Sequence, residues 1–117
     1  MSDYQAPDLE RWLIVKLRRL SLQWPARYES IRRARIEPGV YQCNQCKRPL
    51  KIKELHVDHI NPVKDPRKVK VTLLQFIQSL FCDVENLQVL CKECHEVKSA
   101  KENTVRRKTR GKNGTKL

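Results

Sequence analysis

The chain has 117 residues, which is the length of one domain with terminal segments. Its 25 Lys and Arg residues against 13 Asp and Glu give a net charge of +12, which favours a polyanionic partner and above all nucleic acid. A membrane surface is the rival partner, and the lack of any apolar run of about 18 residues or of a lipidation motif weakens it. The polar, acidic start MSDYQAPDLE is not a secretory signal. We therefore expect a cytoplasmic protein with no membrane partner.

Two basic helices are expected before residue 40. Apolar residues recur with helical spacing over residues 7–24 and should face the core; they are Leu9, Trp12, Leu13, Leu17 and Leu20. Pro25 suits the first position of a second helix that ends near Ile36, before Pro38 and Gly39. The second helix carries Arg27, Arg32, Arg33 and Arg35. These arginines either contact phosphates or form a solvated face, and the sequence leaves both interpretations open.

The middle of the chain is expected to hold two short strands. Apolar and polar residues alternate from Lys51 to His59, which predicts a strand that Asn61 and Pro62 end. A basic loop over residues 61–71 follows. The run Leu-Gln-Val-Leu at residues 87–90 predicts the second strand.

A short helix is expected between these strands, and a longer helix after them. Thr72 and Gln75 have the spacing of a capping box, in which each side chain bonds the backbone N–H of the other residue. The inward face of the short helix is expected to comprise Leu73, Leu74, Ile77, Leu80 and Phe81. The longer helix should open near Cys94 and run to about Arg106. The basic tail after it is expected to be disordered when alone.

Four of the five cysteines form two Cys-x-x-Cys pairs, Cys43 with Cys46 and Cys91 with Cys94. In a reducing cytoplasm such pairs indicate a metal site rather than disulfides. The x-x turn lets two thiolates converge on one tetrahedral ion. Zinc is expected rather than an iron–sulfur cluster, because the clustered cysteine run of a ferredoxin is absent. Four thiolates leave no open coordination position, so this zinc should be structural.

The segment Cys91-Lys-Glu-Cys94-His95 also matches the attachment motif of c-type haem. The context opposes haem, because no export signal is present, the only methionine is Met1, and a second cysteine pair lies upstream. The fifth cysteine, Cys82, lies in an apolar stretch and is expected to be a small buried residue.

Four further residues are of the types that hydrolyse phosphodiesters: Asp58, His59, Asn86 and His95. Neighbours on a strand point to opposite faces, so Asp58 and His59 reach one site only if the strand ends at His59. His95 directly follows Cys94, so the zinc would fix its position. Asp58 and His95 suit a divalent cation, and His59 suits a general base near neutral pH. Asn86 can tie a loop and orient the base.

Each of these residues alone has an ordinary structural explanation, such as surface polarity or a turn. Their order within a basic chain with two cysteine pairs is more specific. The pattern Cys-x2-Cys … Val-Asp-His-Ile … Glu-Asn-Leu-Gln-Val-Leu-Cys-x2-Cys-His-x2-Lys resembles the zinc-containing branch of the HNH endonuclease family. The resemblance covers about residues 34–103 and is most specific at 57–62 and 84–98. Small phage-borne and homing HNH endonucleases come closest.

The resemblance implies an α+β fold, in which a ββα-metal (HNH) finger is stapled by the four-cysteine zinc site and preceded by the two basic helices. It makes His59 the general base and Asn86 the structural asparagine. It makes Asp58 and His95 the ligands of a catalytic divalent ion, Mg²⁺ or another such as Mn²⁺ or Ni²⁺. The implied activity is hydrolysis of DNA to 5′-phosphate and 3′-hydroxyl ends, with no small-molecule substrate.

Several basic residues outside the motif are candidates for DNA contact. Lys98 lies one helical turn beyond His95 and is expected to meet the scissile phosphate. Arg106 and Arg107, at the start of the tail, are expected to hold the DNA backbone. His56 shares a strand face with Asp58, so it either approaches the metal or remains an exposed residue or phosphate contact.

The expected organisation is a helical region at 1–39, the nuclease domain at 40–106 and the tail at 107–117. The first alternative function is a non-catalytic zinc-finger DNA-binding protein, and the second is an RNA-binding zinc protein of ribosomal type. Both alternatives leave Asp58, His59 and Asn86 unexplained. The sequence leaves open nicking against double-strand cleavage, monomer against dimer, the target sequence and the biological role.

Overall fold

The computed structural model describes residues 3–114, with side chains described as far as Thr104. In chain order the elements are α1 (Leu9–Leu20), the 3₁₀ turn η1 (Ser21–Gln23), α2 (Pro25–Ala34), β1 (Arg35–Glu37), β2 (Val40–Gln42), β3 (Pro49–Leu50), β4 (Leu55–His59), α3 (Leu73–Leu80), the 3₁₀ turn η2 (Val84–Asn86), β5 (Leu87–Cys91) and α4 (Lys92–Gly114). The fold is α+β, with small antiparallel sheets between helices. Among the described residues, no helix combines the length and the apolar character needed to cross a membrane.

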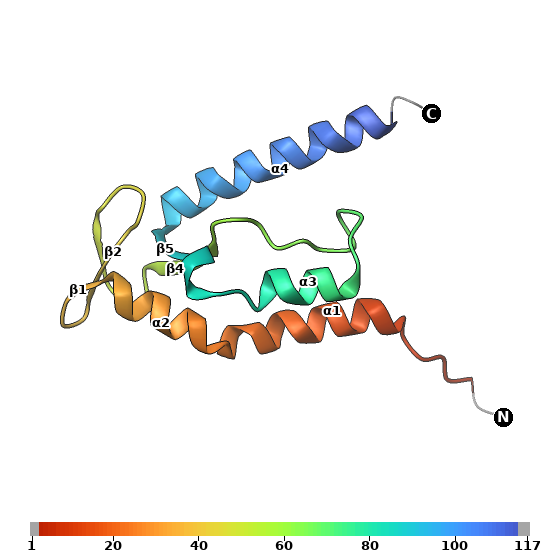
Figure 1. Cartoon of the computed structure of the whole chain (residues 1–117), viewed down its shortest axis with the longest axis horizontal. Coiled ribbons are helices and arrows are strands. Elements are labelled where there is room, and N and C mark those ends of the chain that lie inside the picture. Colours follow the sequence, from red (N-terminus) through yellow and green to blue (C-terminus); the bar gives the residue numbers. More distant parts are fainter. Residues whose placement is uncertain (1–2, 115–117) are drawn as a thin grey trace.

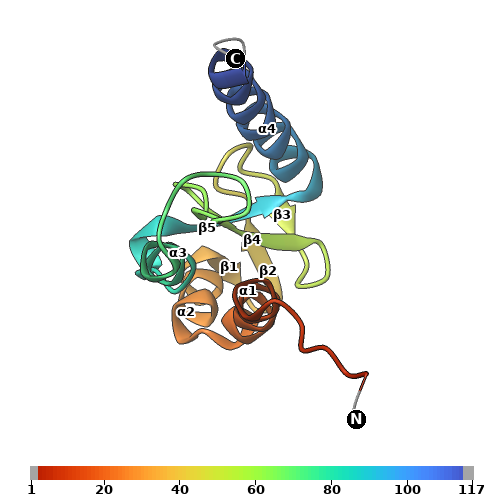
Figure 2. The same ribbon diagram turned by 90° about the vertical axis from the view of Figure 1, so that its right-hand side faces the viewer.

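The strand pair β4–β5 lies at the centre of the arrangement. The two strands run antiparallel with Leu55 opposite Cys91 and His59 opposite Leu87. In both views α4 lies on one side of this pair, and α1 and α2 lie on the other (Figures 1 and 2). The strands β1, β2 and β3 form a separate sheet in that order. The radius of gyration is 17.4 Å, above the ~13 Å of a compact chain of this length, because α4 projects away from the body.

The apolar interior is divided into two small clusters. One surrounds the cysteines and consists of Cys43, Leu50, Val89, Leu90 and Cys91. The other joins α1 to α3 and consists of Ile14, Phe76 and Leu80. Neither cluster is large, so other interactions must add to the stability of the chain.

The N-terminal helices begin as expected but differ in register and length. Pro25 is the first residue of α2, as predicted. The stripe on α1 is only partly right: Ile14 is fully buried, whereas Leu9, Trp12 and Leu20 are exposed. Only a narrow face of α1 is buried, because its partner is the short helix α3, which covers the residues around Ile14.

The second helix is shorter than expected because its last residues form a strand. The helix ends at Ala34 and not at Ile36, and residues 35–37 pair with β2 as β1. Gly39 has φ +76°, a conformation that favours glycine and makes a turn between the two strands. The Pro38-Gly39 signal therefore marks a hairpin turn.

The capping box of α3 is confirmed, and its inward face needs one correction. The Thr72 hydroxyl accepts from Gln75 N at 3.1 Å, and the Gln75 side chain accepts from Thr72 N at 2.8 Å. Phe76 is fully buried, whereas Leu74 is 62% exposed. In an eight-residue helix several neighbouring apolar residues allow more than one buried face, and here the packing of Ile14 selects Phe76.

The remaining boundaries differ by a few residues. The strand predicted over 51–59 begins only at Leu55, because residues 51–54 form a turn closed by Glu54 N–H donating to the Lys51 carbonyl at 2.9 Å. The final helix begins at Lys92 and continues to Gly114, past the expected end at Arg106. Residues 115–117 of the predicted tail lie outside the described residues.

We predict that Phe76→Ala lowers the free energy of unfolding by about 3–5 kcal/mol, because it leaves a cavity between α1 and α3. Leu74→Ala, on the exposed side of the same helix, should change it by about 0.5 kcal/mol or less. Urea unfolding followed by circular dichroism measures both. Equal losses in the two variants would contradict the observed register of α3.

Candidate functional site

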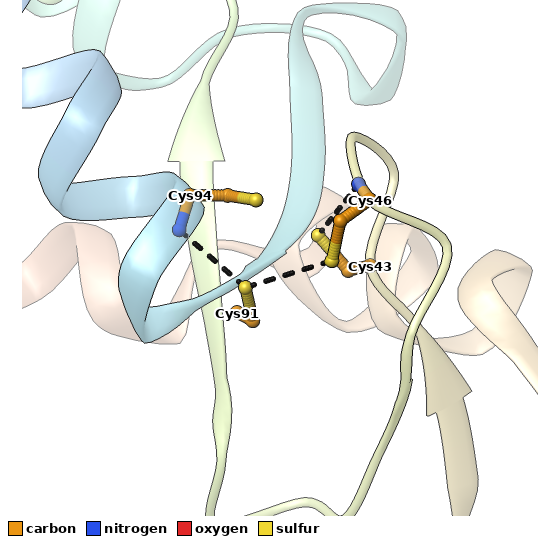
Figure 3. Close-up of side chains that lie close together, drawn as sticks. All are labelled: Cys43, Cys46, Cys91 and Cys94. Carbon is orange, nitrogen blue, oxygen red and sulfur yellow. Dashed lines mark hydrogen bonds between the residues drawn. The ribbon is translucent and has the colours of Figure 1, made fainter.

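The four paired cysteines converge from three elements, the loop after β2, the end of β5 and the first turn of α4 (Figure 3). Their sulfur atoms all lie within 4.8 Å of one another. Tetrahedral zinc with Zn–S bonds of about 2.3 Å sets S···S distances near ~3.8 Å. The Sγ atoms of Cys46 and Cys91 lie 3.8 Å apart. The predicted grouping of Cys43, Cys46, Cys91 and Cys94 is confirmed, and it could hold a metal ion such as zinc.

Backbone N–H groups point at the sulfur of the first cysteine in each pair. Cys46 N donates to Cys43 Sγ at 3.5 Å, and Cys94 N donates to Cys91 Sγ at 3.4 Å. Burial opposes ionisation of Cys43, but backbone N–H donors outweigh it and lower the pKa of its thiol to about 6. The neighbouring Cys91 thiol, followed by burial, raises the pKa of Cys94 to about 12. Four thiolates in this space therefore need a cation to coexist.

The side chains of Asp58 and His95 lie close together, on β4 and α4. Asp58 is 8% exposed on β4, and His95 stands in the first turn of α4, directly after Cys94. Asp58 Oδ1 lies 3.7 Å from His95 Nε2. The predicted pairing of these two side chains is thus present, and the cysteine cluster fixes the helix that carries His95.

The other carboxylate oxygen of Asp58 is held from two sides. Gln88 Nε2 donates to Asp58 Oδ2 at 3.0 Å, and Lys98 Nζ lies 3.1 Å from the same atom. Gln88 is the residue directly across from Asp58 in the β4–β5 register. Both interactions use Oδ2, so they orient the carboxylate with Oδ1 toward His95.

Lys98, on α4, contacts both Asp58 and the last residue of β4. Besides the Asp58 carboxylate, its ammonium donates to the His59 carbonyl at 2.8 Å and pairs with Glu102. Burial lowers its pKa, but Glu102 and Asp58 together raise it above the ordinary value for lysine. Its contact with a scissile phosphate remains a prediction, and its present partners hold the end of β4 to α4.

His59 is the last residue of β4, as the shared-site argument requires. Its Nε2 lies 3.1 Å from the Leu80 carbonyl oxygen, which can only accept, so Nε2 carries the proton and Nδ1 keeps the lone pair. Burial lowers the pKa of His59 below its ordinary value, against the opposing effects of the Leu80 carbonyl and Asp58. The ring is therefore neutral at neutral pH and its orientation is fixed.

Asn86 ties the turn that follows β4. Its Oδ1 accepts from Asn61 N at 2.9 Å, and its Nδ2 donates to the Asn61 carbonyl at 3.3 Å. Its backbone carbonyl also accepts from Ile60 N at 2.8 Å. These bonds hold the backbone of the two residues after His59, and the part of Asn86 in orienting the base stays a prediction.

A cleft of about 320 Å³ brings the candidate residues together. Asp58 and His59 from β4 and His95 from α4 line it. Its lining also includes Arg18 from α1, and Pro62, Val63 and Lys68 from the insert, which is the segment 60–72 between β4 and α3. Asn86 lies outside this lining and acts on the cleft through the turn it holds.

The arginines of the second helix do not share one face. Arg32 and Arg33 both donate to Glu29, whose pKa they lower to about 2. Arg27 is half-buried, and burial lowers the pKa of its guanidinium. Arg35 is exposed in β1. The side chains of the other two arginine candidates, Arg106 and Arg107, lie outside the described residues.

His56 and Cys82 each take a definite place. The ring of His56 is exposed and stacks on the ring of His95, with centroids 5.1 Å apart and an interplanar angle of 12°. It therefore packs on a candidate metal ligand. Cys82 is half-buried rather than buried, and its burial raises the pKa of its thiol.

Sequence reasoning missed Gln88 and Arg18. Asn44 Nδ2 donates to Gln88 Oε1 at 2.9 Å, so Gln88 links the first cysteine pair to Asp58. Gln88 is the polar residue of the second predicted strand. Knowledge of the register between the two strands would have placed it directly across from Asp58. No local signal marks Arg18, because only the packing of α1 on α3 brings it to the cleft.

The donor atoms of Asp58 and His95 fit a divalent ion. Two such ligands on one ion, at about 2.0–2.2 Å each, lie at most about 4.3 Å apart. The observed 3.7 Å meets this limit. A carboxylate oxygen and an imidazole nitrogen are also a common donor set for such ions. The two residues leave the remaining coordination positions to water and substrate.

Comparison of the chain with family models, with curated proteins and with solved structures finds no match.

We predict that Cys94→Ser loses the metal and unfolds the region around β4, β5 and α4, since a structural zinc contributes folding energy directly. Elemental analysis of the purified wild type should find about one zinc per chain. Cys82→Ser, a matched change outside the cluster, should keep it. Release of the zinc by Cys82→Ser, or full retention by Cys94→Ser, would contradict the ligand assignment.

Proposed function

We propose that this chain is a metal-dependent DNA endonuclease of the zinc-containing HNH type. The observation that carries the proposal is the cleft that His59 lines together with the pair formed by Asp58 and His95. The strands β4 and β5 are paired and α4 follows directly, an order that supports a ββα finger. The adjacent cysteine cluster and the net charge of +12 support the same assignment.

His59 has the properties of a general base. Its Nε2 proton is committed to the Leu80 carbonyl, and burial keeps the ring neutral. The free lone pair on Nδ1 takes a proton from a water molecule whose oxygen attacks the phosphorus atom. The bond to the 3′ oxygen breaks, that oxygen takes a proton from solvent, and the products are a 5′-phosphate and a 3′-hydroxyl.

Asp58 and His95 would hold the catalytic ion, Mg²⁺, Mn²⁺ or Ni²⁺. When bound there, it would offset the negative charge on the phosphoryl oxygens and on the leaving 3′ oxygen. Gln88 and Lys98 keep Asp58 in position, and Asn86 keeps the turn after His59 in position. The three functional side chains are thus preorganised by the contacts of their neighbours.

A non-catalytic zinc-finger DNA-binding protein would use the cysteines and the positive charge. It would not need a buried, doubly held Asp58 beside His95, nor a histidine whose tautomer is fixed. The nuclease accounts for these features, so we prefer it. One active site cuts one strand, so a double-strand break requires two binding events or two copies of the chain.

We predict that His59→Ala lowers the cleavage rate by about 10²–10⁴-fold, because it removes the general base. Nicking of supercoiled plasmid in Mg²⁺ or Mn²⁺ measures the rate, with EDTA as the blank. Zinc content and DNA binding in EDTA should stay near those of the wild type.

His56→Ala is the matched control, since it removes an exposed imidazole three positions earlier in the same strand. It should retain cleavage within about tenfold of the wild type, a much smaller loss than that of a general base. If His59→Ala cleaves at the wild-type rate and His56→Ala does not cleave, the general base is His56 and not His59.

A further inference from the structure

Two positive side chains line the cleft beside Asp58, His59 and His95, Arg18 from α1 and Lys68 from the insert. They come from elements outside the strand–strand–helix unit and have no part in the chemistry described above. Glu102 from α4 also lines the cleft. A fixed positive side chain beside a hydrolytic site is suited to a phosphate group.

Arg18 is fixed in place by a buried acid. Its Nη2 donates to Asp65 Oδ2 at 3.0 Å, and Asp65 is only 2% exposed. Its guanidinium carbon lies 5.8 Å from the centre of the Phe76 ring, so the aromatic face supports the group. The Arg18 side chain is nevertheless 40% exposed, which leaves part of the guanidinium accessible.

Asp65 does not neutralise Arg18, because it already has a closer partner. The Arg67 side chain donates to both oxygens of Asp65, through Nε at 3.1 Å and Nη2 at 2.8 Å, and the Arg67 backbone N–H donates at 2.8 Å. Arg67 is the main cause of the lowered pKa of Asp65. One carboxylate between two guanidinium groups leaves one net positive charge, and Arg18 presents it beside the cleft.

The hydrogen bonding of Arg18 is incomplete. Its Nε is buried and has no hydrogen-bond partner within the part of the chain that the structure describes. An unpaired buried donor on a charged group is unfavourable, so the bond to Asp65 does not exhaust the hydrogen-bonding capacity of this guanidinium. Arg18 and His59 line the same cleft.

We propose that Arg18 binds a non-bridging oxygen of the scissile phosphodiester, in the cleft that it lines together with Asp58 and His95. This inference rests on the proposed nuclease function and adds a substrate-binding residue to it. The planar guanidinium is anchored through Nη2, and its exposed N–H groups are offered to the phosphate. Charge developing on the phosphoryl oxygens then meets a fixed donor that needs no rearrangement during the reaction.

The test compares Arg18→Gln with Arg19→Gln in single-turnover cleavage of a short DNA duplex at saturating zinc-loaded protein and Mn²⁺. Arg19 is the next residue of α1, is exposed and does not line the cleft, so the two variants lose the same charge. Arg18→Gln should lower the rate by about 10²-fold or more, as for removal of one fixed transition-state donor. Arg19→Gln should stay within about threefold, a surface charge change that leaves the cleft intact.

A third variant distinguishes two roles of Arg18, binding the phosphate and holding the insert to α1 through Asp65. Asp65→Asn weakens the anchor but keeps the Arg18 guanidinium, so it should retain more than about a tenth of the wild-type rate if Arg18 acts on the substrate. Thermal melting of Arg18→Gln should fall no further than that of Asp65→Asn.

Equal rates in Arg18→Gln and Arg19→Gln would overturn the inference and leave the nuclease in place. Equal loss of rate in Arg18→Gln and Asp65→Asn would also overturn it, because Arg18 would then act only by holding the insert. If the wild-type protein fails to cleave DNA in Mg²⁺, in Mn²⁺ and in Ni²⁺, both the proposed function and this inference are wrong.

Discussion

The convergence of four cysteine sulfurs within 4.8 Å of one another is the constraint on which the rest of the structure depends. The loop after β2, the end of β5 and the start of α4 meet there. The apolar clusters are too small to fix these segments alone. A metal held by the four thiolates would fix the last residue of β5 and, one helical turn later, the position of His95.

The candidate active site lies next to the cysteine cluster and is joined to it by strand pairing and a few hydrogen bonds. The register of β4 against β5 sets Gln88 opposite Asp58, and Lys98 brackets the same carboxylate from α4. Asn86 closes the turn after His59, and the Leu80 carbonyl sets the tautomer of the ring. Each contact is ordinary alone. Together they orient an acid, a neutral imidazole and a second imidazole in one cleft before any substrate arrives.

The sequence predicted the features that depend on local chemistry. Cysteine pairs, the Thr72–Gln75 capping box and the proline at the start of α2 require only neighbouring residues, and all three are present. Features that depend on distant partners were missed. Ile14 and Phe76 bury each other, and neither helix alone reveals which side will be covered. Arg18 reaches the cleft only through that same packing.

The central claim is that one metal shapes the chain while a second ion, in the neighbouring cleft, is needed for DNA hydrolysis. The direct test is to incubate protein holding about one zinc per chain with supercoiled plasmid while Mg²⁺ or Mn²⁺ is titrated in, and to measure zinc content alongside cleavage. The account predicts no cleavage with zinc alone, saturable cleavage on adding the second ion, and an unchanged zinc content. Cleavage that needs no added ion, or none with any ion, would contradict it.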